Sequence, residues 1–433
     1  MKIRSLNINS YRHLENLNFD FTYPEGYANA GKPLNKICII GQSATGKTSV
    51  LQLIKDSISK LDSIKIINGK DLSHYFHSDF SGQLEFLYDD ILQDDNLLQL
   101  TKNTVIKNGQ EFRTPQGSGG GSVGRLMSDG LKLLYLNAEI ISREAINILN
   151  QNPLNILQQL AEEKYSGLQK KFSNADYVYE FGQNVNEEIW FYLLYRILDY
   201  RKRFLQMASE LINKGAIGDF VKLNKQYAQW SETNENPLIS FASYFNPILK
   251  KLNIEVDLVN TEYSIPIKSA NNDEIIPVSS LSTGTKGLLL SMFPLHEIDT
   301  TDSIILLDEP ERSLFPDIQI DLISHYQNLA PDAQFIVATH SPFIAAAFEP
   351  EERFILYFDE NRKVAVRKGE SPIGDDPNDL LRNDFNVDYY NEFGKKAYKQ
   401  YTDLKRKIIQ ENEPEKKKEI LIELTELGDK YNF

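Results

Sequence analysis

Residues 36–50 read KICIIGQSATGKTSV, and this stretch decides the fold. The apolar run at its start is typical of a short, fully buried strand. The run leads directly into a loop bounded by Gly41 and Gly46, and apolar residues at helical spacing then predict a helix over 48–59. A strand, a glycine loop and a helix in this order predict an α/β protein with a phosphate-binding loop.

The residue types of this loop suit a nucleotide. Gly41 and Gly46 let the backbone curl so that its N–H groups, backed by the N-terminus of the helix, face the phosphates. We expect Lys47 to contact the β- and γ-phosphates during catalysis and the Thr48 hydroxyl to bind Mg²⁺. The candidate nucleotide-binding residues are Gly41, Gln42, Ser43, Ala44, Thr45, Gly46, Lys47, Thr48 and Ser49.

A second apolar run, residues 304–307, delivers the carboxylates Asp308 and Glu309 at its carboxyl end. Ligands gather at this edge of an open α/β sheet. We expect Asp308 to hold the Mg²⁺ and Glu309 to orient and deprotonate the attacking water. A third apolar run ends on polar residues at Thr339 and His340, which places another polar side chain at the same edge.

A run of small residues, LSTGTKG at 281–287, precedes the acidic strand and opens a helix. A helix N-terminus of this kind can bind an anion. Alone the run is a weak signal, and an ordinary serine and glycine loop is the simpler interpretation. Its position between the phosphate-binding loop and the acidic pair favours a role in the nucleotide site.

Taken together, these segments resemble the motifs of ABC-type ATPases. The loop 41–48 is similar to Walker A, 281–286 to the signature, 308–316 (DEPERSLFP) to Walker B with the D-loop, and 339–342 (THSP) to the switch histidine. The subtype is similar to the RecF, SMC and OLD-like branch, including the ATPases of bacterial anti-phage systems such as Septu and PARIS. The resemblance covers 1–137 and 254–358, and it implies ATP and Mg²⁺ as ligands.

The resemblance also implies a site shared between two copies. ATP on the P-loop of one protomer would be capped by the signature of another, so that the nucleotide drives head-to-tail association into a homo-oligomer. His340 would sense the γ-phosphate and take part in catalysis. Arg12 and His13 lie in a turn where this family often meets the base or ribose, and an ordinary surface turn is the alternative. The capping residues would be Ser282, Gly284, Thr285 and Lys286.

Three features depart from the family pattern. The signature has Thr283 and the pair Thr285-Lys286 where transporters carry glycine and glutamine, and the D-loop has Phe315 where this branch often has histidine. No Q-loop glutamine is evident in the expected region, 135–139. Asn137 and Glu139 are the candidates to replace it, and a structural role for both is the alternative.

The resemblance implies an α/β fold, a RecF/SMC-like ABC ATPase head with a P-loop mixed sheet and an antiparallel β lobe, and the helical periodicity adds an all-helical insertion. The expected boundaries place the first part of the head at 1–142, a helical insertion for oligomerisation or partner docking at 143–250, and the second part of the head at 251–365. A helical tail would fill 366–433. The pattern over 63–139 suggests strands of the lobe, from Ile64 to Leu136. Within it, the glycine and serine run 117–122 reads as a flexible loop, natural or introduced.

Composition limits the function further. The chain of 433 residues carries a net charge of −14, so any DNA contact would have to be local. The basic runs 201–203 and 416–418 are the candidates, and a solvated helix face is the alternative interpretation of each. The one cysteine, Cys38, suits a reducing cytosol, and neither a signal peptide nor a membrane span is predicted. His74 and His77 are three residues apart, but with no cysteine nearby we expect no metal site there.

These observations predict a cytoplasmic ATPase that senses or transmits a signal in a bacterial anti-phage system. Its effector, a nuclease or toxin, would be a separate protein encoded nearby, because no nuclease motif is evident in the chain. The alternative is a RecF-like DNA repair or clamp ATPase, which predicts stimulation by DNA. A transporter subunit and a slowly cycling ATP-clamped scaffold are the weaker alternatives.

Overall fold

The structure of this chain, a computed structural model, describes residues 2–63, 80–90, 93–101, 105–112, 132–159, 166–168, 178–183, 185, 187–214, 219–387 and 390–431. Three predictions fall outside these ranges. They are the strand residues around Ile64, the pair His74 and His77, and the loop 117–122.

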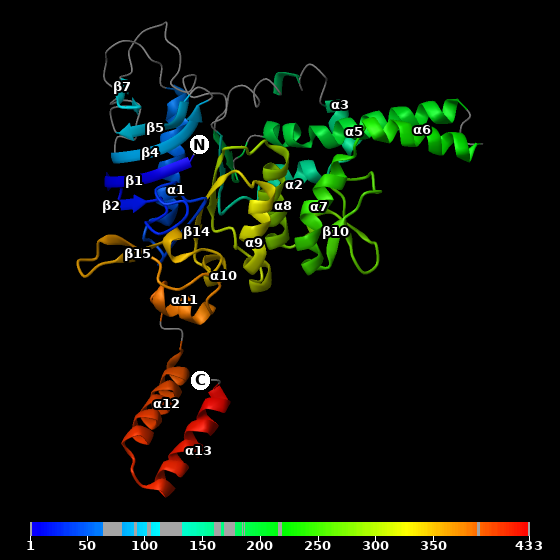
Figure 1. The fold of residues 1–433 in the computed structure, drawn as a ribbon. Helices are drawn as coiled ribbons and strands as arrows, with labels where there is room; N and C mark the ends of the chain where they lie inside the picture. The colour runs from blue at the N-terminus through cyan, green and yellow to red at the C-terminus, as the bar shows by residue number, and fades with distance from the viewer. Residues whose placement is uncertain are drawn as a thin grey trace.

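A seven-stranded, mostly parallel sheet lies at the centre of the molecule (Figure 1). The strand order is β16-β15-β3-β14-β13-β8-β9, in which only β16 runs antiparallel to its neighbour. The strands are β3 (Lys36–Gly41), β8 (Leu133–Leu136), β9 (Val178–Phe181), β13 (Ile304–Asp308), β14 (Gln334–Thr339), β15 (Arg353–Phe358) and β16 (Val364–Lys368).

The apolar runs of this sheet are buried on both faces. Ile37 and Ile39 of β3 belong to one hydrophobic cluster, whereas Cys38 and Ile40 belong to a second cluster on the opposite face. Parallel strands covered on both sides need such continuous apolar sequences. Because β3, β13 and β14 run parallel, their carboxyl ends meet at one edge of the sheet.

A second, antiparallel sheet forms the β lobe, in the order β2-β1-β4-β5-β6-β7. Its first hairpin turns at Arg12, which has a left-handed φ of 55°. One predicted member of the lobe is placed wrongly, because β8 joins the main sheet between β13 and β9 instead. The strands of the lobe are β1 (Lys2–Tyr11), β2 (Leu14–Asp20), β4 (Ser81–Asp90), β5 (Gln93–Thr101), β6 (Val105–Lys107) and β7 (Gln110–Phe112).

Helices dominate the segment between the two halves of the head. The prediction of an all-helical insertion needs one correction, because β9 lies inside it and extends the main sheet. The helices are α2 (Arg143–Asn150), α3 (Pro153–Gln159), α5 (Glu187–Asn213), α6 (Phe220–Thr233) and α7 (Pro237–Leu249), and a 3₁₀ turn follows at Lys250–Leu252. In Figure 1, α5 and α6 extend away from the sheet as a pair.

The second half of the head returns the chain to the main sheet. A small sheet, β10 (Ile254–Val256), β11 (Ile267–Ser269) and β12 (Ile275–Ile276), comes first. The helices around the sheet are α1 (Lys47–Ser63), α8 (Thr283–Glu297), α9 (Pro316–Leu329), α10 (Pro342–Ala345) and α11 (Pro377–Asn383), with 3₁₀ turns at Val278–Ser280 and Pro350–Glu352.

The chain ends in a helical hairpin beyond α11 (Figure 1), formed by α12 (Glu392–Gln410) and α13 (Pro414–Tyr431). Pro414 is the first residue of α13, a position where proline's missing N–H costs no hydrogen bond. The predicted combination of a P-loop mixed sheet, an antiparallel β lobe and a helical insertion is confirmed, with the two corrections above.

Candidate functional site

The loop between β3 and α1 folds around the side chain of Lys47. The Lys47 ammonium donates to the carbonyl oxygens of Gly41 at 2.9 Å and Gln42 at 3.1 Å, which are residues of its own loop. Burial lowers the pKa of Lys47 to about 8, while the carboxylates of Glu309, Asp308 and Glu311 act in the opposite direction. The ammonium therefore lies inside the loop, on the side where the acidic residues are.

The turn at Arg12 and His13 packs against this loop. Gly46 has a φ of 95°, and a Cβ at this position would lie 2.7 Å from Leu14 and 2.9 Å from the His13 ring. Arg12 donates to Gln52 of α1 at 2.9 Å and lies 3.4 Å from the Ser49 hydroxyl. The structure thus brings Arg12 and His13 to the P-loop, and their contact with a base or ribose stays a prediction.

Asp308 lies at the end of β13 and faces the first turn of α1. Its Oδ1 accepts a hydrogen bond from the Thr48 hydroxyl at 3.1 Å, and its Oδ2 accepts one from Tyr135 at 3.3 Å. Burial raises the pKa of Asp308, the bonds from Thr48 and Tyr135 lower it, and the charge of Glu309 raises it. A hydroxyl and a carboxylate, both hard oxygen donors, fit a Mg²⁺ that takes its other ligands from phosphates and water.

Glu309 and His340 lie side by side at the same edge. The His340 Nε2 and the Glu309 Oε1 are 3.6 Å apart, and the two side chains are 40% and 36% exposed. Glu309 has a left-handed φ of 47°, held in part by a bond from its N–H to the Ala338 carbonyl at 2.8 Å. Burial and the charge of Lys47 lower the pKa of His340, while Glu309 raises it, and the net lowering favours the neutral imidazole.

A partly buried glutamate, Glu311, fixes the strand end that carries His340. The Glu311 Oε1 accepts from the Thr339 hydroxyl at 2.6 Å and from the His340 N–H at 2.9 Å. Burial raises the pKa of Glu311 despite these two hydrogen bonds. Glu311 thereby links the acidic strand to the histidine strand, and the sequence had suggested no role for it beyond membership of the motif.

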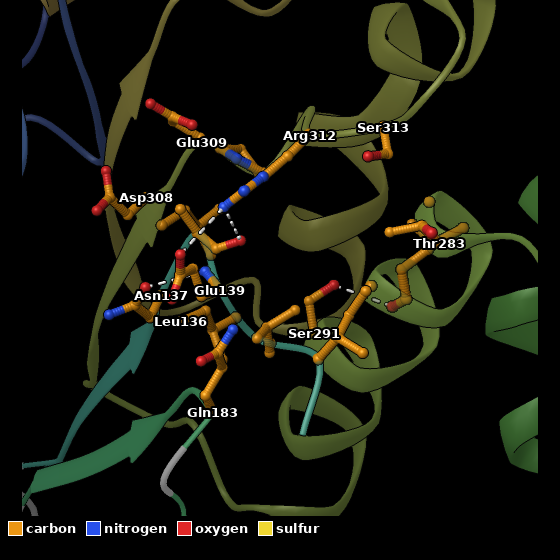
Figure 2. Close-up of a pocket in the computed structure, with 18 of the residues that line it drawn as sticks. Leu136, Asn137, Glu139, Gln183, Thr283, Ser291, Asp308, Glu309, Arg312 and Ser313 are labelled. Atoms are coloured by element: carbon orange, nitrogen blue, oxygen red, sulfur yellow. Dashed lines mark hydrogen bonds and ion pairs between the residues drawn. The ribbon is translucent and has the colours of Figure 1, made fainter. Parts of the chain in front are cut away.

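A pocket of about 370 Å³ opens beside Asp308 and Glu309. Figure 2 shows Asn137, Glu139 and Gln183 on one side of the pocket and Thr283, Ser291 and Ser313 on the other. Asn137 and Glu139 therefore share a pocket with Asp308 and Glu309, and their replacement of a Q-loop glutamine stays a prediction. Gln183 follows β9 and was missed, because the four residues of β9 stand in a stretch of helical pattern.

The signature segment begins α8. Ser282 caps the helix, since its hydroxyl accepts from the Thr285 N–H at 3.2 Å. Gly284 packs so closely on the D-loop that a Cβ would overlap the carbonyl oxygen of Ser313. Ser282 and Thr283 are exposed, Lys286 is half-buried, and Thr285 is buried. No contact described within the chain joins the signature to the P-loop.

Residues 130–345 match the family model described as an AAA ATPase domain. The matched stretch contains the signature segment, Asp308, Glu309 and His340, and it begins after the P-loop. The chain is also 23% identical, over 428 residues, to a protein of Vibrio cholerae serotype O1 biovar El Tor named retron Vc95 probable ATPase. That match covers 88% of this chain and 78% of the relative.

Solved structures similar to this chain include heads of SMC proteins. One, an SMC head bound to the C-winged helix domain of ScpA, has a TM-score of 0.42 and 11% identity, and the match covers 85% of this chain and 97% of that one. Another, the SMC head domain from Thermotoga maritima, has a TM-score of 0.39 and 12% identity, covering 86% and 100%. The similarity to ATPases of Septu and PARIS stays a prediction.

The remaining predictions concern DNA contact, metal binding and membrane spans. Arg201 is 8% exposed and donates a hydrogen bond to the Asn260 carbonyl at 3.1 Å, and Arg203 pairs with Asp199 at 2.9 Å. DNA contact at 201–203 or at 416–418 stays a prediction. Among the described residues, no group of histidine, cysteine and acidic side chains is arranged to hold a metal on its own. None of the described helices combines the length and apolarity that crossing a membrane requires.

Proposed function

We propose that this chain binds and hydrolyses ATP at the edge formed by β3, β13 and β14. The observation that carries the proposal is the meeting of Thr48 with Asp308, at 3.1 Å, beside the pair Glu309 and His340. Side chains with the chemistry to bind phosphate, to hold Mg²⁺ and to accept a proton from water thus lie at one edge. The match of 130–345 to an AAA ATPase domain and the likeness to a probable ATPase support it.

Each side chain has a role that its position permits. The Lys47 ammonium would leave the carbonyls of its loop and bind the β- and γ-phosphates. Thr48 and Asp308 would hold Mg²⁺, which neutralises charge on the phosphates. Glu309, which is partly exposed, would accept a proton from the attacking water. The neutral His340 would donate a hydrogen bond to the γ-phosphate.

We further propose that hydrolysis needs a second copy of the chain. Glu309 and His340 are more than a third exposed, so a single copy does not exclude water from them. The beginning of α8 presents Ser282 and Thr283 to solvent, where they can reach another molecule. Head-to-tail association would place the signature of one copy over the P-loop of the other and enclose the nucleotide.

The biological role that we propose is signalling in a bacterial anti-phage system, in the cytoplasm, with control of a separate nuclease or toxin. The motif subtype and the likeness to a retron ATPase support this role. The parts of the chain outside the catalytic edge, the pair α5 and α6 and the hairpin of α12 and α13, offer surfaces for such a partner. A RecF-like role on DNA is the competing proposal.

The catalytic proposal is tested by Glu309→Gln. The variant should bind ATP as tightly as the wild type and hydrolyse it at least about 100-fold more slowly, which is the usual loss when a general base is removed. Glu232→Gln, on the exposed surface of α6, changes charge equally and should leave both quantities unchanged. Equal turnover by the Glu309 and Glu232 variants would overturn the assignment of Glu309 as the base.

The biological proposal is tested by co-expressing the Glu309→Gln variant with the product of the adjacent gene and measuring the mass of the purified complex. A stable complex whose mass or composition changes with ATP supports control of an effector. A chain that remains alone and assembles only on added double-stranded or gapped DNA, with ATP turnover stimulated by that DNA, favours the repair role.

A further inference from the structure

A second concave site lies at the opposite edge of the main sheet from the P-loop. It encloses about 610 Å³, within the range of roughly 300–1,000 Å³ that is usual for small-molecule pockets. Lys2 and Arg4 of β1 line one part of the site. Residues of the loop 23–35, which directly precedes β3, line another part. The residues that matter to the argument are Lys2, Arg4, Tyr23, Lys32, Asn35 and Asp302.

The strand β3 separates this pocket from the nucleotide site. Asn35 lines the pocket and immediately precedes β3, whereas Gly41, the last residue of β3, begins the P-loop. A strand of this length spans roughly 20 Å at about 3.3 Å per residue. A ligand in the pocket would therefore not touch ATP bound at the P-loop.

The charge of the pocket is opposite to that of the chain. The protein has a net charge of −14, yet three cations, Lys2, Arg4 and Lys32, line this one cavity. In the described part of the chain none of the three forms an ion pair with a carboxylate, and Asp302 is the one acid in the lining. Unneutralised cations converging on a concave surface create a local positive potential that attracts an anion.

The loop that carries Lys32 is held in place by its own hydrogen bonds. The Tyr23 N–H donates to the Lys32 carbonyl at 2.9 Å, and the Gly31 N–H donates to the Tyr23 carbonyl at 2.9 Å. At the strand side, the Lys2 ammonium donates to the Asn35 Oδ1 at 2.5 Å. All three cations are therefore attached to a backbone that is already ordered, since Lys2 and Arg4 lie in β1, and this order reduces the entropy cost of binding.

We propose that this pocket binds the phosphate of a nucleotide, either free or at the end of a nucleic-acid strand. Lys2, Arg4 and Lys32 would contact the phosphate oxygens, and the guanidinium of Arg4 can form two parallel hydrogen bonds to them. Tyr23, Leu87 and Leu97 supply the aromatic and apolar part of the lining, against which a base can pack. The site would give an acidic ATPase a second, separate contact with a nucleotide.

The test uses the full chain carrying Lys47→Ala, which weakens binding at the P-loop. Two probes distinguish the sources of the phosphate. AMP, which lacks the phosphates that Lys47 would bind, is titrated by calorimetry, and a fluorescent single-stranded oligonucleotide with a 5′-phosphate is titrated by anisotropy. The variant Arg4→Gln/Lys32→Gln is compared with Lys222→Gln/Lys225→Gln on the exposed face of α6, which removes the same charge.

Binding of either probe that falls at least tenfold in the Arg4/Lys32 variant, and stays unchanged in the Lys222/Lys225 variant, supports the proposal. AMP binding alone identifies a free nucleotide, and oligonucleotide binding alone identifies a strand end. The affinity for the strand should fall as the salt concentration rises, and the Arg4/Lys32 variant should show a weaker dependence on salt. Absence of binding by both probes, or an equal loss in both variants, overturns it.

Discussion

The hydroxyl of Thr48 donates a hydrogen bond to Oδ1 of Asp308 across 3.1 Å, joining residues 260 positions apart in the chain. The other carboxylate oxygen accepts from Tyr135 at 3.3 Å. Both oxygens of Asp308 therefore lie in positions fixed by neighbours from α1 and β8. The carboxylate is oriented before any metal binds, which is what a Mg²⁺ site with strict geometry requires.

Tyr135→Phe tests this orientation. The change removes one hydrogen bond to Asp308 without emptying space, and such a bond to a charged group contributes about 1.5–3 kcal/mol. Since the Tyr135 bond lowers the pKa of Asp308, its loss raises that pKa further and disfavours the ionised ligand. The Mg²⁺ concentration for half-maximal ATP turnover should rise about tenfold, with kcat at saturating Mg²⁺ little changed.

The matched control for this experiment is Tyr326→Phe. Tyr326 is also buried, but its hydroxyl contacts Ser291 at 2.7 Å and not the carboxylate of Asp308. This variant should keep the wild-type Mg²⁺ dependence. An unchanged Mg²⁺ dependence in Tyr135→Phe, or an equal shift in both variants, contradicts the positioning role.

Much of this edge could be predicted because each of its residues follows an apolar strand. Lys47, Asp308 and His340 all come within a few residues of such a run, and parallel strands bring these ends together. Gln183 could not be predicted in this way, since β9 has only four residues and its partner in the sheet is not evident from sequence.

The position of β8 also could not be predicted, because the sequence does not show which strand it pairs with. Its residues, Leu133 to Leu136, are uniformly apolar, and a run of this length indicates a buried strand without indicating which strand it pairs with. The partner that decides its place, β13, begins at Ile304, far along the chain. The pocket at Lys2, Arg4 and Lys32 likewise forms only when the loop 23–35 folds back on β1.

Two glycines three residues apart in α8 test the packing of the signature on the D-loop. A Cβ on Gly284 would overlap the carbonyl of Ser313, whereas a Cβ on Gly287 would meet nothing closer than the Ile140 side chain at 3.9 Å. Gly284→Ala should therefore displace the D-loop, lower the melting temperature and weaken ATP turnover. Gly287→Ala should be neutral or raise stability by up to about 1 kcal/mol, since alanine is the better helix former.

Thermal unfolding and steady-state ATP turnover of the two alanine variants separate these outcomes. The comparison is internal, because both substitutions add one methyl group to the same helix. If Gly284→Ala melts and turns over ATP like Gly287→Ala, the close approach between α8 and Ser313 does not exist in the working enzyme.

ATP affinity should depend on pH through Lys47. The pKa of this lysine is lowered to about 8 by burial, so below pH 8 the free protein already carries the ammonium that binds phosphate. Above pH 8 the free lysine is neutral, and ATP binding must first take up a proton. The Kd for ATP should then rise towards tenfold per pH unit between pH 8 and 10.

Calorimetry in two buffers of different ionisation enthalpy measures this proton uptake directly. The wild type should take up close to one proton at pH 9 and close to none at pH 7. Lys47→Met should bind ATP weakly, with an affinity that does not change over the same range. Equal proton uptake by the wild type and Lys47→Met would assign the titration to another group.

Phe315 tests the proposed association of two copies. It stands in the D-loop at the start of α9 and is 73% exposed, which is unusual for a phenylalanine next to a catalytic edge. Its side chain makes no capping bond to the helix, so alanine at this position should leave the stability of the single copy intact. If a second copy covers the ring, Phe315→Ala removes a contribution of about 1.5–3 kcal/mol and weakens ATP-dependent association by at least tenfold.

Sedimentation of the Glu309→Gln variant with ATP gives the reference association constant. The same measurement is then made on the Glu309→Gln variant that also carries Phe315→Ala. Phe220→Ala is the control, because Phe220 is 74% exposed but lies on α6, away from the catalytic edge. A loss specific to Phe315 places the D-loop inside the interface, as head-to-tail packing requires. A loss on replacing Phe220 alone would instead place the interface on the pair α5 and α6 and leave the nucleotide site of each copy open.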